Sequence, residues 1–337
     1  MPANLTPEYR KAEAAYRRAR EPREQLECLR VMLRAIPKHK GTDHLQADIK
    51  TRIKELTDEL AGPKKGATRS GPPTFVHPEG AAQVALLGPP NSGKSMLHDR
   101  LTGSHAAVGP YPFTTQYAQP GMLPIEDVSI QLVDLPPVSR EHPVPWIGNA
   151  VQQADGALLV VDLAHPGCLE ETVTLTELLT ERKVLLDGVW PDLSGEQHDG
   201  DDPFTVHLPT LLVVAKVDLL EDPDEELAVF QDLTGLDYPV IAMSTTTGEG
   251  LEEIGPWLLE RLGVVRVYTK VPGKSADLSR PFTVRVGDTV ADVARLVHRD
   301  LAADLKFARL WGDGSFDGQQ VGADHRVRDG DVIELHV

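Results

Sequence analysis

The most constraining feature of the chain is a glycine-rich segment that directly follows a short apolar run. Residues 88–95 read Gly-Pro-Pro-Asn-Ser-Gly-Lys-Ser and fit the pattern G-x-x-x-x-G-K-[ST], and the apolar residues 84–87 precede them. A buried strand that ends in such a turn and continues as a helix directs successive backbone N–H groups toward one point, where an anion can bind. The pattern therefore predicts a phosphate-binding loop.

The side chains and backbone of this loop suggest separate roles. Lys94 supplies a cation for the β and γ oxygens of a nucleotide, and the hydroxyl of Ser95 can bind Mg²⁺. An ordinary glycine-rich turn is the alternative interpretation. The residues that we expect to surround the phosphates are Gly88, Pro89, Pro90, Asn91, Ser92, Gly93, Lys94, Ser95 and Met96.

Length and composition set the frame around the loop. The chain has 337 residues, 41% of them hydrophobic, so that it can bury a substantial core and divide into two or three domains. No apolar run approaches the length of a membrane-spanning helix, and the N-terminal residues are polar. Its two cysteines, Cys28 and Cys168, have no metal-ligand or disulfide spacing. We therefore expect a cytoplasmic globular protein without a membrane partner.

The net charge of −17 is unevenly distributed. Residues 1–80 carry a net charge of +5, residues 81–265 carry −22, and residues 266–337 are neutral. An acidic middle region repels nucleic acid, whereas the basic N-terminal region could neutralise phosphates if its charges share one face. A solvated helix surface explains the basic residues equally well.

Periodicity and turn residues predict the order of the domains. The pattern of residues 1–60 predicts two helices. The first begins at Thr6-Pro7-Glu8. The second carries an apolar stripe of Leu45, Ile49, Ile53, Leu56 and Leu60. Residues 61–80 are rich in Gly, Pro and Ser and predict a linker. Residues 81–262 alternate short apolar runs with helical stretches, which indicates an α/β domain on a mainly parallel sheet. Residues 263–337 form a small domain with strands at 281–286 and 332–337 and a helix at 289–301.

Polar side chains follow several predicted strands of the α/β domain. The strand candidates are residues 128–133, 157–161, 211–214 and 240–242. Asp134 follows the first, Lys216 and Asp218 follow the third, and Ser244 and Thr245 follow the fourth. Because ligands bind at the carboxyl ends of parallel strands, we expect one crevice to collect these residues with the phosphate loop.

In this order the clusters resemble the G1 to G5 motifs of GTPases. Residues 111–115 (Tyr-Pro-Phe-Thr-Thr) resemble the switch I signature of the Obg and DRG (developmentally regulated GTP-binding protein) families, and residues 36–42 resemble the DRG N-terminal region. Residues 267–270 begin a segment that resembles a TGS domain, and this similarity continues through 311–312 and 321–325 to the end. The resemblance covers most of the chain. It implies a P-loop GTPase domain at 81–262, an N-terminal helical pair and a β-grasp-like TGS domain at 263–337.

The resemblance also implies roles for individual residues. Asp134 would hold Mg²⁺ through water, while Thr115, or in the less favoured alternative Thr114, would reach Mg²⁺ and the γ-phosphate. Lys94, Thr115 and Asp134 would then be the catalytic set, with Ser95, Thr115 and Asp134 around the metal.

Base recognition would rest on the remaining motif residues. Asp218 would accept both N–H groups on the Watson–Crick edge of guanine, a pairing that adenine cannot reproduce. Lys216 would pack across the nucleotide, and the backbone N–H of Thr245, next to Ser244, would donate to the guanine carbonyl.

Two positions depart from the family pattern, and a third, which the DRG and Obg families share, departs from many other G proteins. D-x-P-G is present as Asp134-Leu135-Pro136-Pro137, and proline has no N–H to offer to the γ-phosphate. N-K-x-D begins with Ala215, so the amide that ties this strand to the phosphate loop is missing. Val138 stands where many G proteins carry the glutamine that orients water.

These features predict a GTP- and GDP-binding protein with slow, Mg²⁺-dependent GTP hydrolysis that is coupled to the ribosome, to RNA or to a translation-associated protein. Asn91 matches the position that potassium-stimulated GTPases use for K⁺, which adds K⁺ as a candidate ligand, although a loop-stabilising role for this side chain is an equal alternative. The alternative function is a non-switching adaptor that binds nucleotide and acts through its TGS and helical regions.

Overall fold

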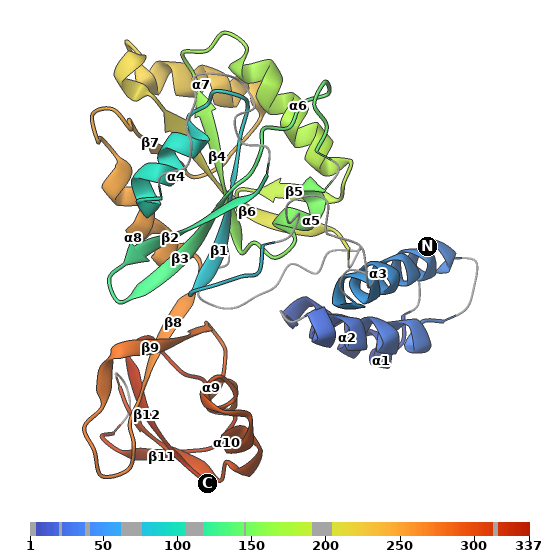
Figure 1. Ribbon diagram of the computed structural model, residues 1–337, viewed down its shortest axis with the longest axis vertical. Coiled ribbons are helices and arrows are strands. Elements are labelled where there is room, and N and C mark those ends of the chain that lie inside the picture. The colour runs from blue at the N-terminus through green and yellow to red at the C-terminus, as the bar shows by residue number, and fades with distance from the viewer. Residues whose placement is uncertain are drawn as a thin grey trace. The chain divides into compact units, whose positions relative to one another are not determined.

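The computed structural model describes residues 5–19, 22–37, 41–61, 76–104, 117–144, 146–190, 204–312 and 316–337 (Figure 1). The described residues form two compact units. One unit contains the N-terminal helices together with residues 204 and 205, and the other contains residues 76–190 and 206–337. The predicted linker at 61–80 lies mostly outside the described residues.

Three helices build the N-terminal unit: α1 (Pro7–Arg18), α2 (Pro22–Ala35) and α3 (Asp43–Ala61). The prediction of two helices was wrong, because α2 begins at Pro22 as a separate helix. A continuous first helix would need a backbone N–H at residue 22, and proline has none. Tyr9, Leu29 and Ile49 are fully buried, one from each helix. Along the predicted stripe of α3, Ile49 and Leu56 are buried, but Leu60 is 39% exposed.

Seven strands form the sheet of the second unit. They are β1 (Ala82–Leu87), β2 (Gln119–Ile125), β3 (Val128–Asp134), β4 (Gly156–Asp162), β5 (Val184–Asp187), β6 (Val206–Ala215) and β7 (Val240–Ala242). Their order is β2-β3-β1-β4-β6-β5, with β7 also paired to β6. All these pairs are parallel except β2–β3, which confirms the mainly parallel sheet. The four predicted strands are present as β3, β4, β6 and β7.

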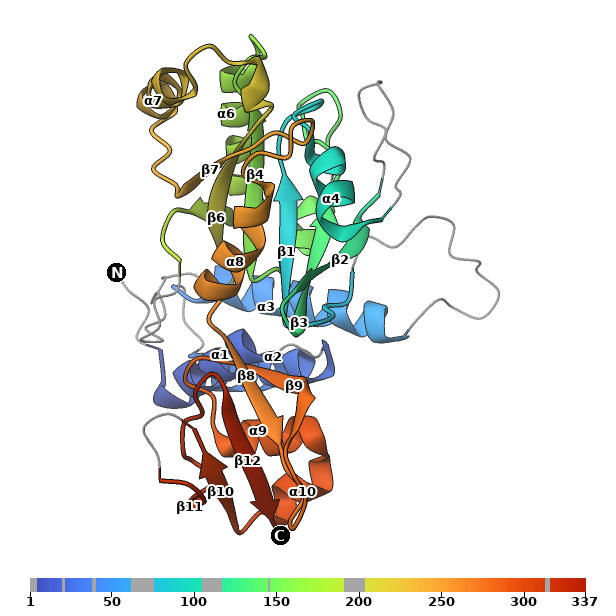
Figure 2. The same ribbon diagram turned by 90° about the vertical axis from the view of Figure 1, so that its left-hand side faces the viewer.

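Helices cover both faces of this sheet (Figures 1 and 2). They are α4 (Lys94–Thr102), α5 (Ile147–Val151), α6 (Cys168–Thr180), the short 3₁₀ turn η1 (Val217–Leu219), α7 (Pro223–Thr234) and α8 (Leu251–Arg261). Alternate residues of β1 point to opposite faces: Leu86 packs in one core with Leu97 of α4 and Leu258 of α8, while Leu87 packs in the other with Leu175 of α6. Both faces are therefore buried, which leaves the edge formed by the strand ends for a ligand.

The C-terminal domain is a five-stranded mixed sheet with a helical layer. Its elements are β8 (Val264–Thr269), β9 (Asp277–Arg285), α9 (Val290–Val297), α10 (Arg299–Asp304), β10 (Phe307–Trp311), β11 (Gln319–Val321) and β12 (Asp331–His336), in the strand order β11-β10-β12-β8-β9. Val293 of α9 packs with Val267 and Ile333 of the sheet. The single helix predicted at 289–301 is in fact two, because His298 is extended (φ −166°) and its ring accepts from the N–H of Asp300.

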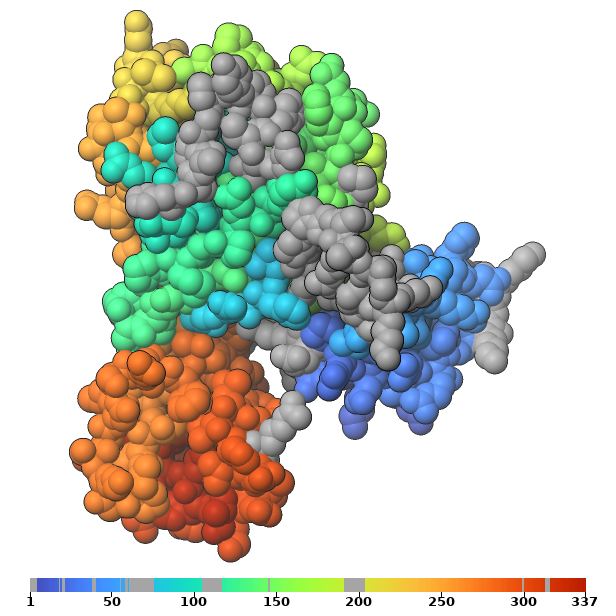
Figure 3. Space-filling view, viewed as in Figure 1, coloured from blue at the N-terminus to red at the C-terminus, as the bar shows by residue number. Residues whose placement is uncertain are grey.

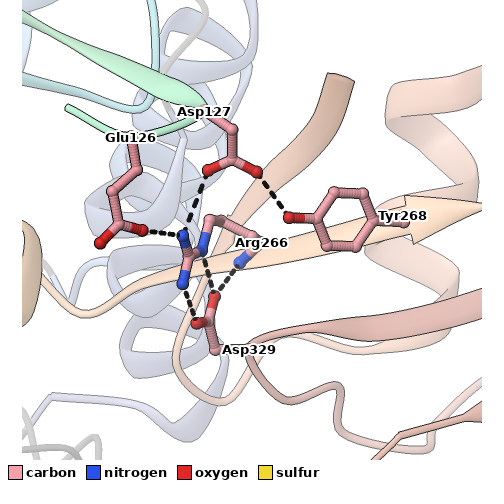
Figure 4. Close-up of polar contacts among 5 residues, drawn as sticks. All are labelled: Glu126, Asp127, Arg266, Tyr268 and Asp329. Atoms are coloured by element: carbon pink, nitrogen blue, oxygen red, sulfur yellow. Dashed lines mark hydrogen bonds and ion pairs between the residues drawn. The ribbon is translucent and has the colours of Figure 1, made fainter. Parts of the chain in front are cut away.

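Arg266 of β8 joins this domain to the turn between β2 and β3 (Figure 4). Its guanidinium contacts Glu126, lies 3.2 Å from Asp127 Oδ1 and donates to Asp329 Oδ2 at 2.7 Å, while the Tyr268 hydroxyl donates to Asp127 Oδ2 at 2.5 Å. In the space-filling view, the orange β8–β9 region adjoins the green β2–β3 region (Figure 3). This ion-pair cluster, Glu126, Asp127, Arg266, Tyr268 and Asp329, lies where β3 begins, at the opposite end of the strand from Asp134.

Candidate functional site

The phosphate loop follows β1 and leads into α4, as the sequence predicts. Gly88 has φ +149°, and a Cβ atom at this residue would lie only 2.2 Å from the backbone oxygen of Val160. Gly93 has φ +100° and occupies the N-cap of α4. Glycine is therefore required at 88 for close packing against β4 and favoured at 93 by the backbone conformation.

Lys94, the first residue of α4, lies inside this loop. Its side chain is buried, and Nζ donates to the carbonyl oxygens of Gly88 at 3.0 Å and Pro89 at 2.8 Å. Burial lowers the pKa of Lys94 to about 8, while the negative charges of Asp134 and Glu171 act in the opposite direction. The loop thus holds an ammonium group in a desolvated position, where its interaction with an anion is strong.

Ser95 and Asp134 form the second part of the site. The Ser95 hydroxyl donates to Asp134 Oδ2 at 2.6 Å, and Asp134 is fully buried at the end of β3. The parallel register between β1 and β3 pairs Leu86 with Asp134 and so brings this carboxylate beside the loop. A hydroxyl and a carboxylate next to a phosphate loop are the oxygen donors that suit Mg²⁺. Thr114 and Thr115 lie outside the described residues.

Lys216 connects the end of β6 to the phosphate loop. Its backbone is left-handed (φ +59°), and its Nζ donates to the Asn91 backbone oxygen at 2.9 Å and to Asp162 Oδ2 at 2.5 Å. Asp218 lies two residues further on, in η1, and is exposed. Our sequence interpretation missed Asp162, although it follows the predicted strand at 157–161 and so satisfies the rule that selected Asp134.

The loop after β7 lies against the start of α4. Ser244 is fully buried, and its hydroxyl oxygen accepts from the backbone N–H groups of Thr246 and Thr247, both at 3.1 Å. The Thr245 hydroxyl lies 3.1 Å from the sulfur of Met96, which brings two predicted site residues together. Arg100 of α4 donates to the Thr245 backbone oxygen at 2.8 Å, a contact that no sequence motif indicated.

The two departures from the family pattern, Pro137 and Ala215, and the valine in place of the glutamine are all buried. Val138 is 4% exposed and belongs to the core beneath the sheet, and Pro137 beside it is also buried. Ala215 is 2% exposed, and a Cβ atom at Gly93 would lie 3.7 Å from its methyl group. At residue 215 the strand therefore presents a methyl group, and no hydrogen-bonding side chain, near the phosphate loop.

Two family models match the chain in the regions just described. The model described as 50S ribosome-binding GTPase matches residues 83–187, and the TGS domain model matches residues 265–337. Together with the fold and the loop, they define the class: a GTPase with a P-loop domain followed by a TGS domain. Among the helices of the described residues, none has the length and apolar character to span a membrane.

Full-length relatives make the assignment more specific. An uncharacterized GTP-binding protein of Methanocaldococcus jannaschii is 27% identical over 93% of this chain and 92% of its own length. An uncharacterized GTP-binding protein of Halobacterium salinarum is 28% identical over 93% of this chain and 98% of its own length. The developmentally regulated G-protein 1 of Arabidopsis thaliana is 26% identical over 88% of this chain and 87% of its own length. Over most of its length the chain is therefore similar to developmentally regulated GTP-binding proteins, as its motifs predicted.

Proposed function

We propose that this GTP-binding protein hydrolyses GTP slowly in a Mg²⁺-dependent reaction. The observation that carries the proposal is the 2.6 Å contact between Ser95 and Asp134 next to the buried ammonium group of Lys94. Side chains of this kind around a phosphate loop can hold a nucleotide triphosphate and its metal ion.

Each residue has a distinct task in this proposal. Lys94 contacts the β and γ oxygens and compensates the charge that develops there. Ser95 and Asp134 would hold Mg²⁺, Asp134 through water, and Thr115 would contact Mg²⁺ and the γ-phosphate. Mg²⁺, when bound, would neutralise phosphate charge. Val138 cannot orient water, so we expect turnover on the order of 10⁻⁴ to 10⁻² per second without a partner.

Guanine selection is assigned to the residues after β6 and β7. Asp218 is exposed and accepts the two N–H groups of guanine, and Lys216 lies across the loop beside it. Ser244 fixes the turn from which the Thr245 N–H donates to the base. Asn91 offers a side-chain oxygen to K⁺, which would add positive charge near the phosphates.

We assign the partner to translation, in the cytoplasm. The description of the matching G-domain family names the 50S ribosome, and the chain carries a basic N-terminal region and a TGS domain on either side of its acidic centre. Contacts with the ribosome, RNA or a translation-associated protein through those flanking regions would hold the acidic domain against its partner despite the repulsion between its charge and nucleic acid.

Multiple-turnover GTP hydrolysis, measured with and without K⁺ and beside a Lys94→Ala variant, tests the hydrolase. We expect slow wild-type turnover that the variant loses. Wild-type turnover that persists in Lys94→Ala would point to a contaminating enzyme and contradict the proposal.

The alternative function, a nucleotide-binding adaptor without a switch, is favoured by Pro137 and Ala215. Pro137 cannot donate to a γ-phosphate, and its fixed φ limits backbone movement between nucleotide states. Tight binding of GDP and GTP with equal affinity, together with no turnover, would support this alternative.

A further inference from the structure

The missing amide at residue 215 raises the question of what holds the base-recognition strand to the phosphate loop. Ala215 ends β6, and its methyl group contributes only packing beside Gly93. A polar connection between the same two segments exists one residue later, where Lys216 Nζ donates to the Asn91 backbone oxygen at 2.9 Å.

Asp162 holds this lysine from the neighbouring strand. In the parallel pairing of β4 and β6, Asp162 is the partner of Ala215, and its Oδ2 lies 2.5 Å from Lys216 Nζ. The other carboxylate oxygen, Oδ1, accepts from the backbone N–H of Ala164 at 3.1 Å. Asp162 is 9% exposed, so its carboxylate has a fixed position and direction.

We propose that Asp162 is a positioning residue that holds the ammonium group of Lys216 over the phosphate loop, so that a polar connection between this loop and the base-recognition strand is kept although residue 215 has no side-chain amide. The inference rests on the proposed function, because it concerns guanine-nucleotide affinity at the same site. The side chain of Lys216 is long, flexible and 35% exposed, so without its ion pair it would lose conformational entropy each time a nucleotide binds. The ion pair with Asp162 orders this side chain before the nucleotide binds. It also keeps Lys216 Nζ in place to donate to the backbone oxygen of Asn91 in the loop.

Asp162→Asn tests this role while it preserves the turn. Asparagine keeps the Oδ1 acceptor for the Ala164 N–H but loses the negative charge that attracts Lys216. We expect a fluorescent GDP analogue to dissociate about tenfold faster, and the affinities for GDP and GTP to fall by the same factor. Turnover at saturating GTP should change by less than twofold, because the contact lies on the base side of the loop.

Asp277→Asn is the matched control. Asp277 of the TGS domain also accepts from a backbone N–H two residues ahead, that of Ser279, but lies outside the nucleotide site. This variant should retain wild-type nucleotide dissociation. If Asp162 were only a turn-forming residue, both variants would leave dissociation unchanged, and the inference would be overturned.

A double-mutant cycle with Lys216→Met separates positioning from a direct effect. If Asp162 acts through Lys216, Asp162→Asn should have no further effect on GDP affinity in the Lys216→Met background. Independent, additive losses would overturn the inference. A wild-type chain that binds neither GDP nor GTP would contradict the proposed function and this inference together, whereas wild-type binding with unchanged affinity in Asp162→Asn would contradict the inference alone.

Discussion

In the proposed site, Pro137 cannot donate to a γ-phosphate, because its nitrogen carries no hydrogen. We predict that Pro137→Gly strengthens binding of a non-hydrolysable GTP analogue about fivefold relative to GDP, the gain expected from one hydrogen bond of about 1 kcal/mol. The variant should also lose some stability, because glycine has more conformational freedom when unfolded. Calorimetry of both nucleotides checks the ratio. The exposed Pro143→Gly is the control, and an unchanged ratio in Pro137→Gly would refute the prediction.

Asp218 is the residue that we propose to recognise guanine, and because its side chain is exposed, its effect on base recognition can be tested separately from stability. Asp218→Asn should weaken GDP binding by at least tenfold and abolish the preference for guanine over adenine nucleotides, with an unchanged melting temperature. Competition of GDP, ADP and a fluorescent GDP analogue measures the preference. Asp222→Asn, four residues away, should keep it, because its side-chain oxygen continues to cap α7. Guanine preference retained by Asp218→Asn would exclude the proposed base contact.

The site residues differ in how far sequence could locate them. Asp134, Lys216 and Ser244 follow apolar runs, and parallel pairing brings such positions to one edge of the sheet. Asp162 also follows an apolar run, but the sequence interpretation missed it because no motif surrounds it. The contact between Arg100 and the Thr245 backbone oxygen joins residues 145 positions apart and depends on how α4 packs, which no local pattern encodes.

At the scale of elements, the turn from β1 into α4 depends on the close approach of Gly88 to β4. An added methyl group would meet the Val160 oxygen at 2.2 Å, so we predict that Gly88→Ala costs about 2–3 kcal/mol, lowers the melting temperature by about 5 °C or more and abolishes nucleotide binding. Gly235→Ala is the matched control. Gly235 also has positive φ (+68°) but has no atom within 4 Å of the added methyl group, so only backbone strain of about 1 kcal/mol remains. Equal losses of stability, measured by thermal unfolding, would show that the contact with β4 is unimportant.

The fold was predictable where one periodic pattern continued through a whole element. Strands β3, β4, β6 and β7 of the α/β sheet are short apolar runs and were identified from them. The errors occur where a single residue interrupts a helical pattern: Pro22 divides the first predicted helix, and His298 divides the helix at 289–301. Strand β2 was missed because it contains Pro120 and Pro124 and pairs as the antiparallel edge strand, where proline is tolerated.

At the scale of the whole molecule, the ion-pair cluster around Arg266 makes the contact between the P-loop domain and the TGS domain sensitive to pH. Hydrogen bonds from Arg266 lower the pKa of Asp329 against the opposing effect of burial. Burial raises the pKa of Asp127, but hydrogen bonds from Tyr268 and Arg266 outweigh it, so that this pKa is also lowered. The folded state therefore favours both carboxylates in their ionised form. Their contribution to stability is complete above the ordinary aspartate pKa of about 4 and is lost as the pH falls through the lowered values.

Arg266→Met should remove this contribution while it keeps the apolar stem of the side chain. Because Glu126 is 63% and Asp329 is 46% exposed, solvent screens the pairs, and we predict a loss of only about 1 kcal/mol, or about 3 °C in melting temperature, at pH 7. The difference from wild type should shrink below pH 4 and also at high salt, as the carboxylates are protonated or screened. Thermal unfolding across pH 3–7 measures it, with the exposed Arg261→Met as a control that should stay near wild type. A difference that is constant across this pH range would mean that Arg266 stabilises the protein by packing and not by its charge.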